Sequence, residues 1–229
     1  MDKDVIIACD FSSLEETKTF LSKFADEKPY VKVGMELYYS EGPKVVKEIK
    51  AMGHKIFLDL KLHDIPNTVS KAMSNITKMG VDMTNVHAAG GIKMMHAAKE
   101  AVAGSQTKLI AVTQLTSTSE DMMQNELLID KPIDDVVAKY AANANEAGLD
   151  GVVCSPLEAR LIKDTCGAEF LTVTPGIRFA DDAKGDQVRV TTPADAKESS
   201  DFIVVGRSIT AADDPVAAYK KCVKDFLGE

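Results

Sequence analysis

Residues 55–68 read KIFLDLKLHDIPNT, an apolar run that gives way to charges and then to the start of a helix. Lys55–Leu60 is apolar enough to be buried on both faces, which is typical of a strand in a parallel sheet. Asp59, Lys61 and Asp64 nevertheless place three charges at or just beyond its end. A solvated turn could hold them, but at a buried strand end they must pair with each other or face a ligand. The environment of this strand end therefore decides what the charges do.

The same alternation of strand and helix runs along the whole chain. Amphipathic stretches with helical spacing follow short apolar runs, and helix starts are indicated at Ser12 or Ser13, at Asn67-Thr68 and at Asp213-Asp214-Pro215. The apolar runs are Val5–Cys9, Tyr30–Val33, Lys55–Leu60, Met83–Val86, Leu109–Leu115, Gly151–Cys154, Phe170–Val173 and Phe202–Val205.

Eight such units in 229 residues predict a (β/α)8 TIM barrel of the α/β class, formed as a single domain over residues 1–229. A doubly wound open sheet is the structural alternative. Against it, no G-x-G-x-x-G follows the first strand, and the phosphate-binding pattern G-x-x-x-x-G-K-[ST] does not occur. No linker or low-complexity tract suggests a second domain.

Composition limits the class of protein. A hydrophobic content of 45% supports a large core, while a formal net charge of −8 without a basic stripe argues against nucleic acid as a partner. The N-terminus does not resemble a signal peptide, and no apolar run approaches the roughly 18 residues of a membrane span. The four cysteines are scattered, with no C-x-x-C pair. We therefore expect a cytoplasmic protein with no membrane partner.

Polar or conformationally special residues stand at nearly every predicted strand end. In such barrels the carboxyl ends of the strands form the active-site face. Residues two apart point to the same side of a strand, so Asp59 and Lys61 should both point into the barrel mouth, with Lys32 on the adjacent strand and Asp10 beyond it. A row that alternates Asp and Lys neutralises itself, which explains how the charges could be buried.

This row could support decarboxylation without a cofactor. Two unit charges 4 Å apart interact by about 4 kcal/mol at an effective dielectric of about 20. A substrate carboxylate held against Asp59 would be destabilised by about that amount until it left as carbon dioxide. Lys61 could then protonate the remaining carbanion. A structural ion-pair network would have the same sequence, so the charges alone leave both interpretations open.

An acidic protein can bind a phosphorylated ligand only in a locally basic or amide-lined pocket. Gly206 and Arg207 follow the last predicted strand, and the loops after the seventh and eighth strands of such barrels often bind phosphate. Arg178, in the segment TPGIR, and Gln187 add donors from the seventh loop. The polar stretch Phe179–Gln187 is expected to be a mobile loop.

Several of these segments together resemble the orotidine 5′-monophosphate decarboxylase family in its short bacterial form. DLKLHDIPNT (59–68) matches the family signature D-x-K-x-x-D-I-P-N-T, and the resemblance runs from about Asp10 to Thr210. Only that signature is very specific. The weaker matches are ACDF near the start, VKVG at the second strand, VTQLTST (112–118), TPGIR (174–178) and VVGRSIT (204–210).

The resemblance implies a role for each matching residue. Lys61 would donate the proton, Asp59 would lie beside the departing carboxylate, and Lys32 would hold Asp59 and contact the ribose. Asp64, accompanied by Thr68, would reach into the site of a neighbouring subunit, which requires a homodimer. No metal or organic cofactor is implied, and the product would be uridine 5′-monophosphate, the last step of de novo pyrimidine nucleotide synthesis. The remaining substrate contacts would be Asp10 to a ribose hydroxyl, Thr116 to the pyrimidine edge, Gln187, Gly206 and Arg207 to the phosphate, and Arg178 near them.

Two other functions remain as alternatives. Sugar-phosphate decarboxylases and aldolases of the same superfamily share the D-x-K-x-x-D pattern but use magnesium and an enediolate. The IPNT segment and the two arginine-containing segments favour the nucleotide enzyme over them. A non-catalytic nucleotide-binding barrel is the alternative of another class, and it would be expected to lose Lys61 or Asp59 first.

Overall fold

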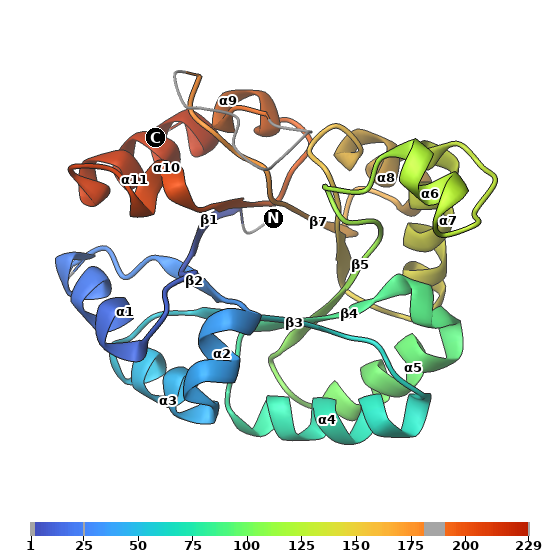
Figure 1. Ribbon diagram of the computed structural model, residues 1–229, viewed down its shortest axis with the longest axis horizontal. Helices are drawn as coiled ribbons and strands as arrows, with labels where there is room; N and C mark the ends of the chain where they lie inside the picture. Colours follow the sequence, from blue (N-terminus) through green and yellow to red (C-terminus); the bar gives the residue numbers. More distant parts are fainter. Residues whose placement is uncertain (1–2, 25, 181–190, 229) are drawn as a thin grey trace.

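The computed structural model describes residues 3–24, 26–180 and 191–228, in which eight parallel strands close into a barrel (Figure 1). Each strand pairs with the next along the chain, and β8 pairs with β1. The predicted barrel is therefore confirmed, and the open doubly wound sheet is wrong. The strands are β1 (Asp4–Ala8), β2 (Tyr30–Val33), β3 (Ile56–Leu62), β4 (Met83–His87), β5 (Lys108–Val112), β6 (Gly151–Val153), β7 (Leu171–Thr174) and β8 (Phe202–Val205).

Helices surround the strands on the outside (Figure 1). In the ranges that the structure describes, no helix is both long and apolar enough to cross a membrane. The helices are α1 (Leu14–Leu21), η1 (Ser22–Phe24), α2 (Met35–Glu41), α3 (Pro43–Ala51), α4 (Pro66–Lys78), η2 (Ala88–Gly90), α5 (Gly91–Val102), α6 (Glu120–Asn125), α7 (Ile133–Glu146), α8 (Ala159–Cys166), α9 (Pro193–Ala196), α10 (Arg207–Thr210) and α11 (Pro215–Leu227).

Local sequence signals explain most helix starts. Ser13 caps α1, its hydroxyl accepting from the Glu16 amide at 3.2 Å, and Asp214 caps α11. The predicted start at Asn67-Thr68 was wrong, because α4 begins at Pro66 without a side-chain cap. Proline has no N–H to satisfy at the first helical position, so this start does not need a capping side chain.

Two strands, β5 and β3, end more than one residue away from the predicted position. β5 ends at Val112 rather than at Leu115, because Leu115 begins a turn that the Thr118 amide closes with a 2.9 Å bond to the Leu115 carbonyl. β3 continues past Leu60 to Leu62, but its pairing with β4 shifts register on the way. The charged residues Asp59 and Lys61 therefore lie within β3, at an irregular part of its ladder.

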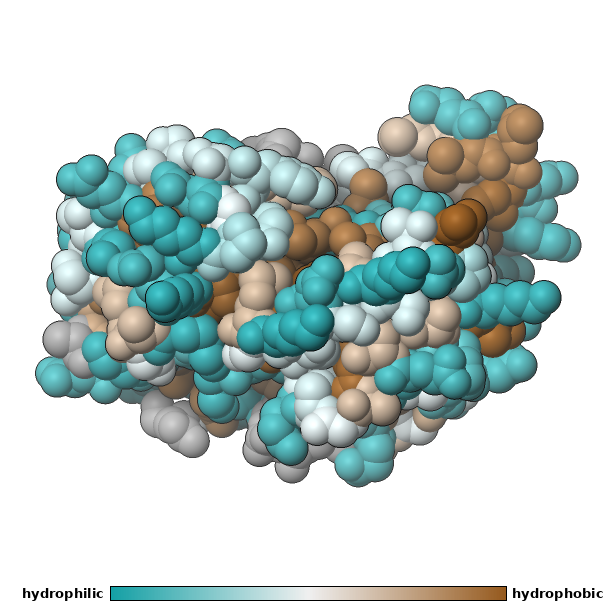
Figure 2. Space-filling view, turned by 90° about the horizontal axis from the view of Figure 1, so that it is seen from below, coloured by the Kyte–Doolittle hydropathy of each residue, from teal (hydrophilic) through white to brown (hydrophobic). Residues whose placement is uncertain are grey.

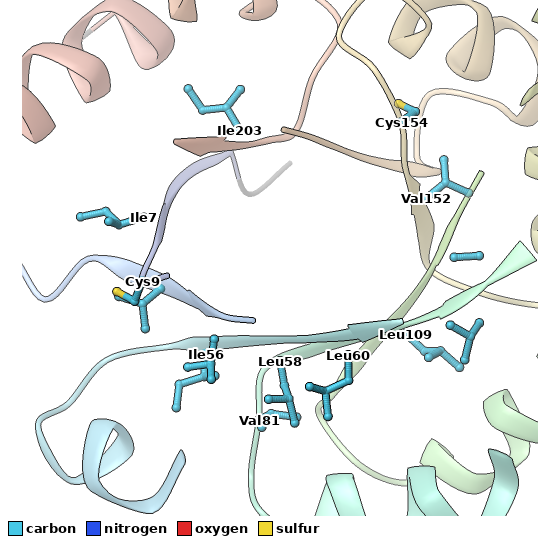
Figure 3. Packing of buried hydrophobic residues seen from close by; sticks show 14 of the residues in the cluster. Ile7, Cys9, Ile56, Leu58, Leu60, Val81, Leu109, Val152, Cys154 and Ile203 are labelled. Atoms are coloured by element: carbon cyan, nitrogen blue, oxygen red, sulfur yellow. The ribbon is translucent and has the colours of Figure 1, made fainter. Parts of the chain in front are cut away.

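Side-chain alternation along the strands divides the core into two parts. Outward-pointing residues, among them Ile7, Leu58 and Ile203, pack between barrel and helices (Figure 3). Inward-pointing residues, among them Ile6 and Phe57, fill the barrel interior. All are buried, so the strands are apolar on both faces, as expected for a parallel sheet covered by helices.

The cysteines behave as small hydrophobic residues. Cys9, Cys154 and Cys222 are buried, Cys166 is partly buried, and all four are free. Burial raises the pKa of the Cys9 thiol to about 12. A thiol with so high a pKa is a poor nucleophile at neutral pH, so Cys9 contributes to packing and not to chemistry.

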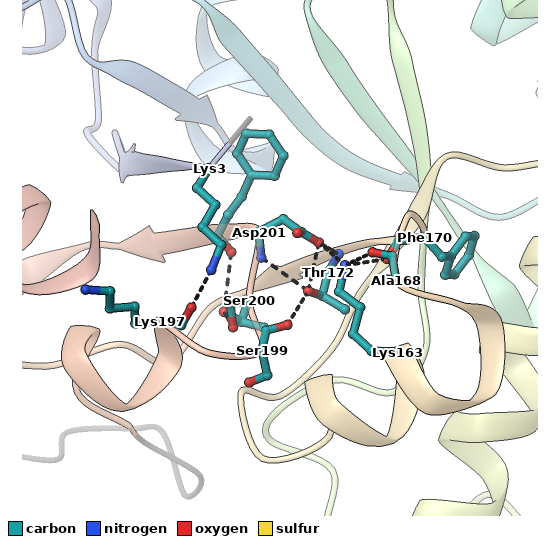
Figure 4. Close-up of polar contacts among 11 residues, drawn as sticks. Lys3, Lys163, Ala168, Phe170, Thr172, Lys197, Ser199, Ser200 and Asp201 are labelled. Atoms are coloured by element: carbon teal, nitrogen blue, oxygen red, sulfur yellow. Dashed lines mark hydrogen bonds and ion pairs between the residues drawn. The ribbon is translucent and has the colours of Figure 1, made fainter. Parts of the chain in front are cut away.

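A buried ion pair joins α8 to Asp201, the residue before β8, at the amino-terminal end of the barrel (Figure 4). The Lys163 ammonium lies 2.6 Å from the Asp201 carboxylate and also donates to the Ala168 and Phe170 carbonyls at 2.8 and 2.9 Å. Asp201, which is 2% exposed, further accepts from the Thr172 amide at 2.8 Å. Both charges are therefore well satisfied, far from the barrel mouth.

Replacing Asp201 with asparagine should lower the free energy of unfolding by about 3 kcal/mol, because the Lys163 charge would stay buried without its counterion. Urea denaturation followed by circular dichroism would measure this change. Asp164→Asn is the matched control, since Asp164 pairs with Arg160 on the same helix but is 63% exposed. That control should lower the free energy of unfolding by less than about 1 kcal/mol. Equal losses in both variants would mean that burial adds nothing to the Lys163–Asp201 pair.

Candidate active site

A cavity of about 440 Å³ opens at the carboxyl ends of the strands. Its lining includes the alternating charged row predicted from sequence, which is now defined by distances. The Lys32 ammonium lies 2.8 Å from Asp10 Oδ1 and 3.6 Å from Asp59 Oδ2, and the Lys61 ammonium lies 2.7 Å from Asp59 Oδ1. Because β1, β2 and β3 are neighbours, three adjacent strands supply the whole row.

The centre of this row is buried and ionised. Burial alone would raise the pKa of Asp59, but Lys32, Lys61 and a hydrogen bond from Asn85 outweigh it and hold the pKa below its ordinary value. Burial alone would lower the pKa of Lys32, but Asp59 and Asp10 outweigh it and raise the pKa. The pair therefore keeps a fixed anion beside a fixed cation at neutral pH.

Asn85 is a site residue that the sequence reasoning missed. It lies on β4 and is 0% exposed. Its side-chain amide donates to Asp59 Oδ1 at 2.7 Å, and its side-chain oxygen accepts from the Lys61 amide at 2.8 Å. The signal was available, because an asparagine inside an apolar strand needs hydrogen-bond partners in the core.

Gly34 lies next to the Lys32–Asp10 pair. A Cβ atom at this position would lie 3.0 Å from both Asp10 Oδ1 and the Lys32 ammonium nitrogen. The backbone of Gly34 is extended, so the need for glycine is steric and not conformational. The segment VKVG thus supplies both a charge of the row and the space that this charge needs.

The opposite side of the cavity is lined from β7 and β8. Gly176, Arg178, Gly206 and Arg207 lie there, and Thr116 lines the wall that follows β5. The described lining contains four cationic and two anionic side chains, a net charge of +2 in a protein of net charge −8. The locally basic pocket that the acidic composition required is therefore present at the barrel mouth.

Two predicted site residues are not brought to this lining. Asp64 and Thr68 are exposed beside the cavity, and neither lines it within the single chain. Gln187 lies outside the described residues, as does most of the predicted loop Phe179–Gln187, of which only Phe179 and Ala180 are described.

Two histidines lie behind the row. The rings of His63 and His87 are 5.8 Å apart, and burial, with His63 and Lys61 nearby, lowers the pKa of His87. Neither residue is part of the described cavity lining. In the part of the chain covered by the structure, no group of three or more His, Cys, Asp or Glu side chains is arranged to hold a metal ion.

A second hollow, of about 450 Å³, lies at the other end of the barrel. It is lined by residues at the amino-terminal ends of β5 to β8, including Lys108, Asp150 and Phe202. One of its acidic groups, Asp150, is already engaged, since it accepts from the Lys99 ammonium and from the Leu109 amide. The barrel mouth, with its charged row and basic wall, is therefore the candidate active site.

Known proteins resemble this chain over nearly its whole length. A family model described as "Orotidine 5′-phosphate decarboxylase / HUMPS family" matches residues 3–222. Orotidine 5′-phosphate decarboxylase of Geobacillus sp. (strain WCH70) is 56% identical to this chain, covering 100% of it and 99% of the relative. That of Listeria monocytogenes is 59% identical, with coverages of 96% and 97%. The crystal structure of orotidine 5′-phosphate decarboxylase from Lactobacillus acidophilus has a TM-score of 0.88 at 45% identity, covering 98% of this chain and 99% of that one.

Proposed function

The chain belongs to the orotidine 5′-phosphate decarboxylase / HUMPS family, and we propose that its barrel mouth decarboxylates orotidine 5′-monophosphate with Lys61 as the proton donor. The enzyme is a carboxy-lyase that forms uridine 5′-monophosphate, the last step of de novo pyrimidine nucleotide synthesis. The observation that carries the assignment of roles is the buried row in which Lys61 lies 2.7 Å from Asp59. The reaction takes place without a metal or organic cofactor.

The charges of the cavity orient the substrate. The phosphate lies against Gly206 and Arg207, with Arg178 nearby and Gln187 assigned to the same group. The pyrimidine edge faces Thr116, and the ribose hydroxyls face Asp10 and Lys32. A phosphate dianion and a carboxylate match a lining of net charge +2, so the substrate is attracted as a whole while its carboxylate meets Asp59.

Bond breaking then follows from the row. The bond between the ring carbon and the carboxylate breaks, its electron pair stays on the ring carbon, and carbon dioxide leaves. The Lys61 ammonium stabilises this developing charge and transfers its proton to the same carbon, after which the amine regains a proton from water. Asp59 disfavours the bound carboxylate and holds Lys61 in place, with 2.7 Å between the Lys61 ammonium nitrogen and Asp59 Oδ1.

The first test is the ultraviolet spectrum of orotidine 5′-monophosphate incubated with the protein in excess EDTA. Conversion to the uridine spectrum is the expected result, and it would establish the decarboxylase without a required dissociable metal. Sugar-phosphate turnover restored by magnesium, with no nucleotide turnover, would assign the chain to the other enzymes of the superfamily. Inactivity in both assays would favour the nucleotide-binding barrel.

A homodimer completes the site. Asp64 and Thr68 are exposed in the single chain, and Ile65 between them is a large apolar residue that is 66% exposed. Met35 and Tyr39 of α2 are exposed as well. Figure 2 shows apolar side chains between polar ones on the face where α2 to α5 lie in Figure 1. A second copy that covers this face would carry its Asp64 and Thr68 to the first copy's cavity.

Mixing two inactive variants would test the shared site. Lys61→Ala and Asp64→Ala should each be nearly inactive alone, whereas subunit exchange should restore about one quarter of the sites, since heterodimers hold one intact site each. The same mixture of Lys61→Ala with Asp59→Ala is the control, because both of these residues act in the same subunit. Recovery in neither mixture would place Asp64 in its own subunit's site.

We place this reaction in the cytoplasm. The four cysteines are free, and three of them are buried as apolar side chains, which suits a reducing compartment. Nucleotide synthesis uses soluble phosphorylated intermediates, and the net positive charge of the cavity lining suits such anions.

A further inference from the structure

We propose that Asn85 is a positioning residue that holds Lys61 and Asp59 in the geometry needed for proton transfer. The inference rests on the proposed function and adds to it a residue that touches no substrate. Asn85 is fully buried beneath the row and is absent from the described cavity lining, so it must act through the two residues that it contacts.

The first reason is an irregularity in the β3–β4 ladder. Leu58 pairs with Thr84 and Leu62 pairs with Val86, so Asp59, Leu60 and Lys61 together face only Asn85. A bulge of this kind leaves backbone groups without ladder partners and re-aims the side chains within it. Both charged residues of β3 lie in this bulge.

The second reason is the backbone of Lys61. Its φ angle is +51°, in the left-handed region that residues other than glycine rarely adopt. Its amide donates to the Asn85 side-chain oxygen at 2.8 Å instead of to a β4 carbonyl. Strained conformations persist only where surrounding contacts fix them, and here the Asn85 oxygen is such a contact.

The third reason is the hydrogen bond that the Asn85 side-chain NH2 group donates. The Asn85 amide group donates to Asp59 Oδ1 at 2.7 Å, the oxygen that also receives the Lys61 ammonium at 2.7 Å. An ionised carboxylate can only accept and a backbone N–H can only donate, so the orientation of the Asn85 amide has a single solution. One short side chain thus links the backbone of Lys61 to the carboxylate that its ammonium contacts.

This double requirement makes asparagine difficult to replace. Aspartate keeps the acceptor for the Lys61 amide but places a carboxylate where Asp59 needs a donor. Alanine removes both bonds and leaves the Lys61 amide without its buried partner. The two substitutions therefore separate the two bonds that the inference invokes.

The test compares Asn85→Ala and Asn85→Asp with wild type. We expect kcat to fall about 100-fold in both variants, because a displacement of about 1 Å in a catalytic group costs this much. The affinity for uridine 5′-monophosphate, which needs the phosphate wall and not the bulge, should change less than about threefold. The matched control is Thr84→Val, since Thr84 is equally buried on β4 but its hydroxyl donates to the Leu58 carbonyl and not to the charged row. It should lower the Tm and leave kcat unchanged.

The pH profile adds a readout that a purely structural role would not move. The loss of the Asn85 donor disfavours the ionised form of Asp59, so the acid limb of kcat/KM should shift to higher pH, further in Asn85→Asp than in Asn85→Ala. The other charged or titratable groups around Asp59 are Lys61 on β3, Lys32 on β2, Asp10 after β1 and His87 on β4. All of these remain in the variants.

The outcomes distinguish this inference from the proposed function. If wild type does not convert orotidine 5′-monophosphate, the proposed function fails, while carbon-13 titration of the Asp59 carboxyl still tests the contact with Asn85. If wild type is active, then an unchanged kcat, or equal losses in kcat and product affinity, would overturn the positioning role. Failure of both variants to fold would assign Asn85 to the fold alone and would also overturn it.

Discussion

Replacing Lys61 with alanine should lower kcat by at least about 10⁴-fold, while the affinity for uridine 5′-monophosphate stays within about fivefold. In the proposed mechanism, Lys61 combines two contributions that are usually separate. Proton donation by a positioned group contributes about 10²–10⁴-fold, and electrostatic stabilisation of developing charge contributes about 10²–10³-fold. The product no longer carries the carboxylate, so its binding depends little on the charge that is removed.

Stopped incubations with radiolabelled carboxylate would measure turnover over this range, and isothermal titration would measure product affinity. Lys55→Ala is the matched control, because Lys55 is an exposed lysine just before the same strand and should leave both quantities unchanged. The Lys61→Ala variant should regain part of its activity in methylamine, which can enter the vacated space as an ammonium. Wild-type turnover in Lys61→Ala would remove this residue from the mechanism.

The energies explain why Lys61 should matter more than repulsion alone. Two unit charges 4 Å apart interact by about 4 kcal/mol at an effective dielectric of about 20, whereas enzymes commonly lower barriers by about 8–23 kcal/mol. Repulsion between Asp59 and the substrate carboxylate therefore supplies only part of the acceleration. A pre-organised ammonium is a second contribution, and the Asp59 and Asn85 contacts fix its position before the substrate arrives.

The charged row could be predicted because it depends only on side-chain alternation and on the order of strands. Asp59 and Lys61 are two residues apart, so a regular strand already places them on one side. Strand order then brings Lys32 and Asp10 alongside. These rules need no knowledge of distances, and the measured contacts agree with them.

The bulge could not be predicted from the same rules. A register shift depends on how two strands far apart in sequence fit together, and nothing local to β3 indicates that Lys61 takes a left-handed conformation. The partners of Asn85 likewise become visible only once β3 and β4 are paired, although its place inside an apolar strand already indicated that it needed hydrogen-bond partners. The role proposed for Asp64 has a different obstacle, because the proposed sharing of a site between subunits is not visible within one chain.

Phosphate recognition explains how distant binding can serve the chemistry. In the proposed binding mode the phosphate lies across the cavity from Asp59, because β7 and β8 stand opposite or nearly opposite β3 in the closed barrel. It therefore cannot assist bond breaking directly. The binding energy of the phosphate can hold the substrate carboxylate against Asp59, which repels it. Binding energy used in this way raises the rate as well as the affinity.

Replacing Arg207 with alanine should consequently lower kcat/KM for orotidine 5′-monophosphate by about 10²–10³-fold, because the proposed charge-assisted contact to the phosphate would be lost. Turnover of the phosphate-free nucleoside orotidine, already slow, should stay within about twofold of its wild-type value. Arg160→Ala is the matched control, since Arg160 is 77% exposed on α8 and pairs only with Asp164 among the described contacts.

The comparison of the two substrates is what makes the Arg207 result specific. A general disturbance of the barrel mouth would reduce turnover of nucleotide and nucleoside alike, whereas loss of a phosphate contact affects only the substrate that carries the phosphate. Added phosphite, which fills the vacated phosphate position when the nucleoside is bound, should activate wild type toward orotidine and fail to activate Arg207→Ala. Equal losses for both substrates would show that Arg207 supports the structure of the site and that the phosphate is held elsewhere.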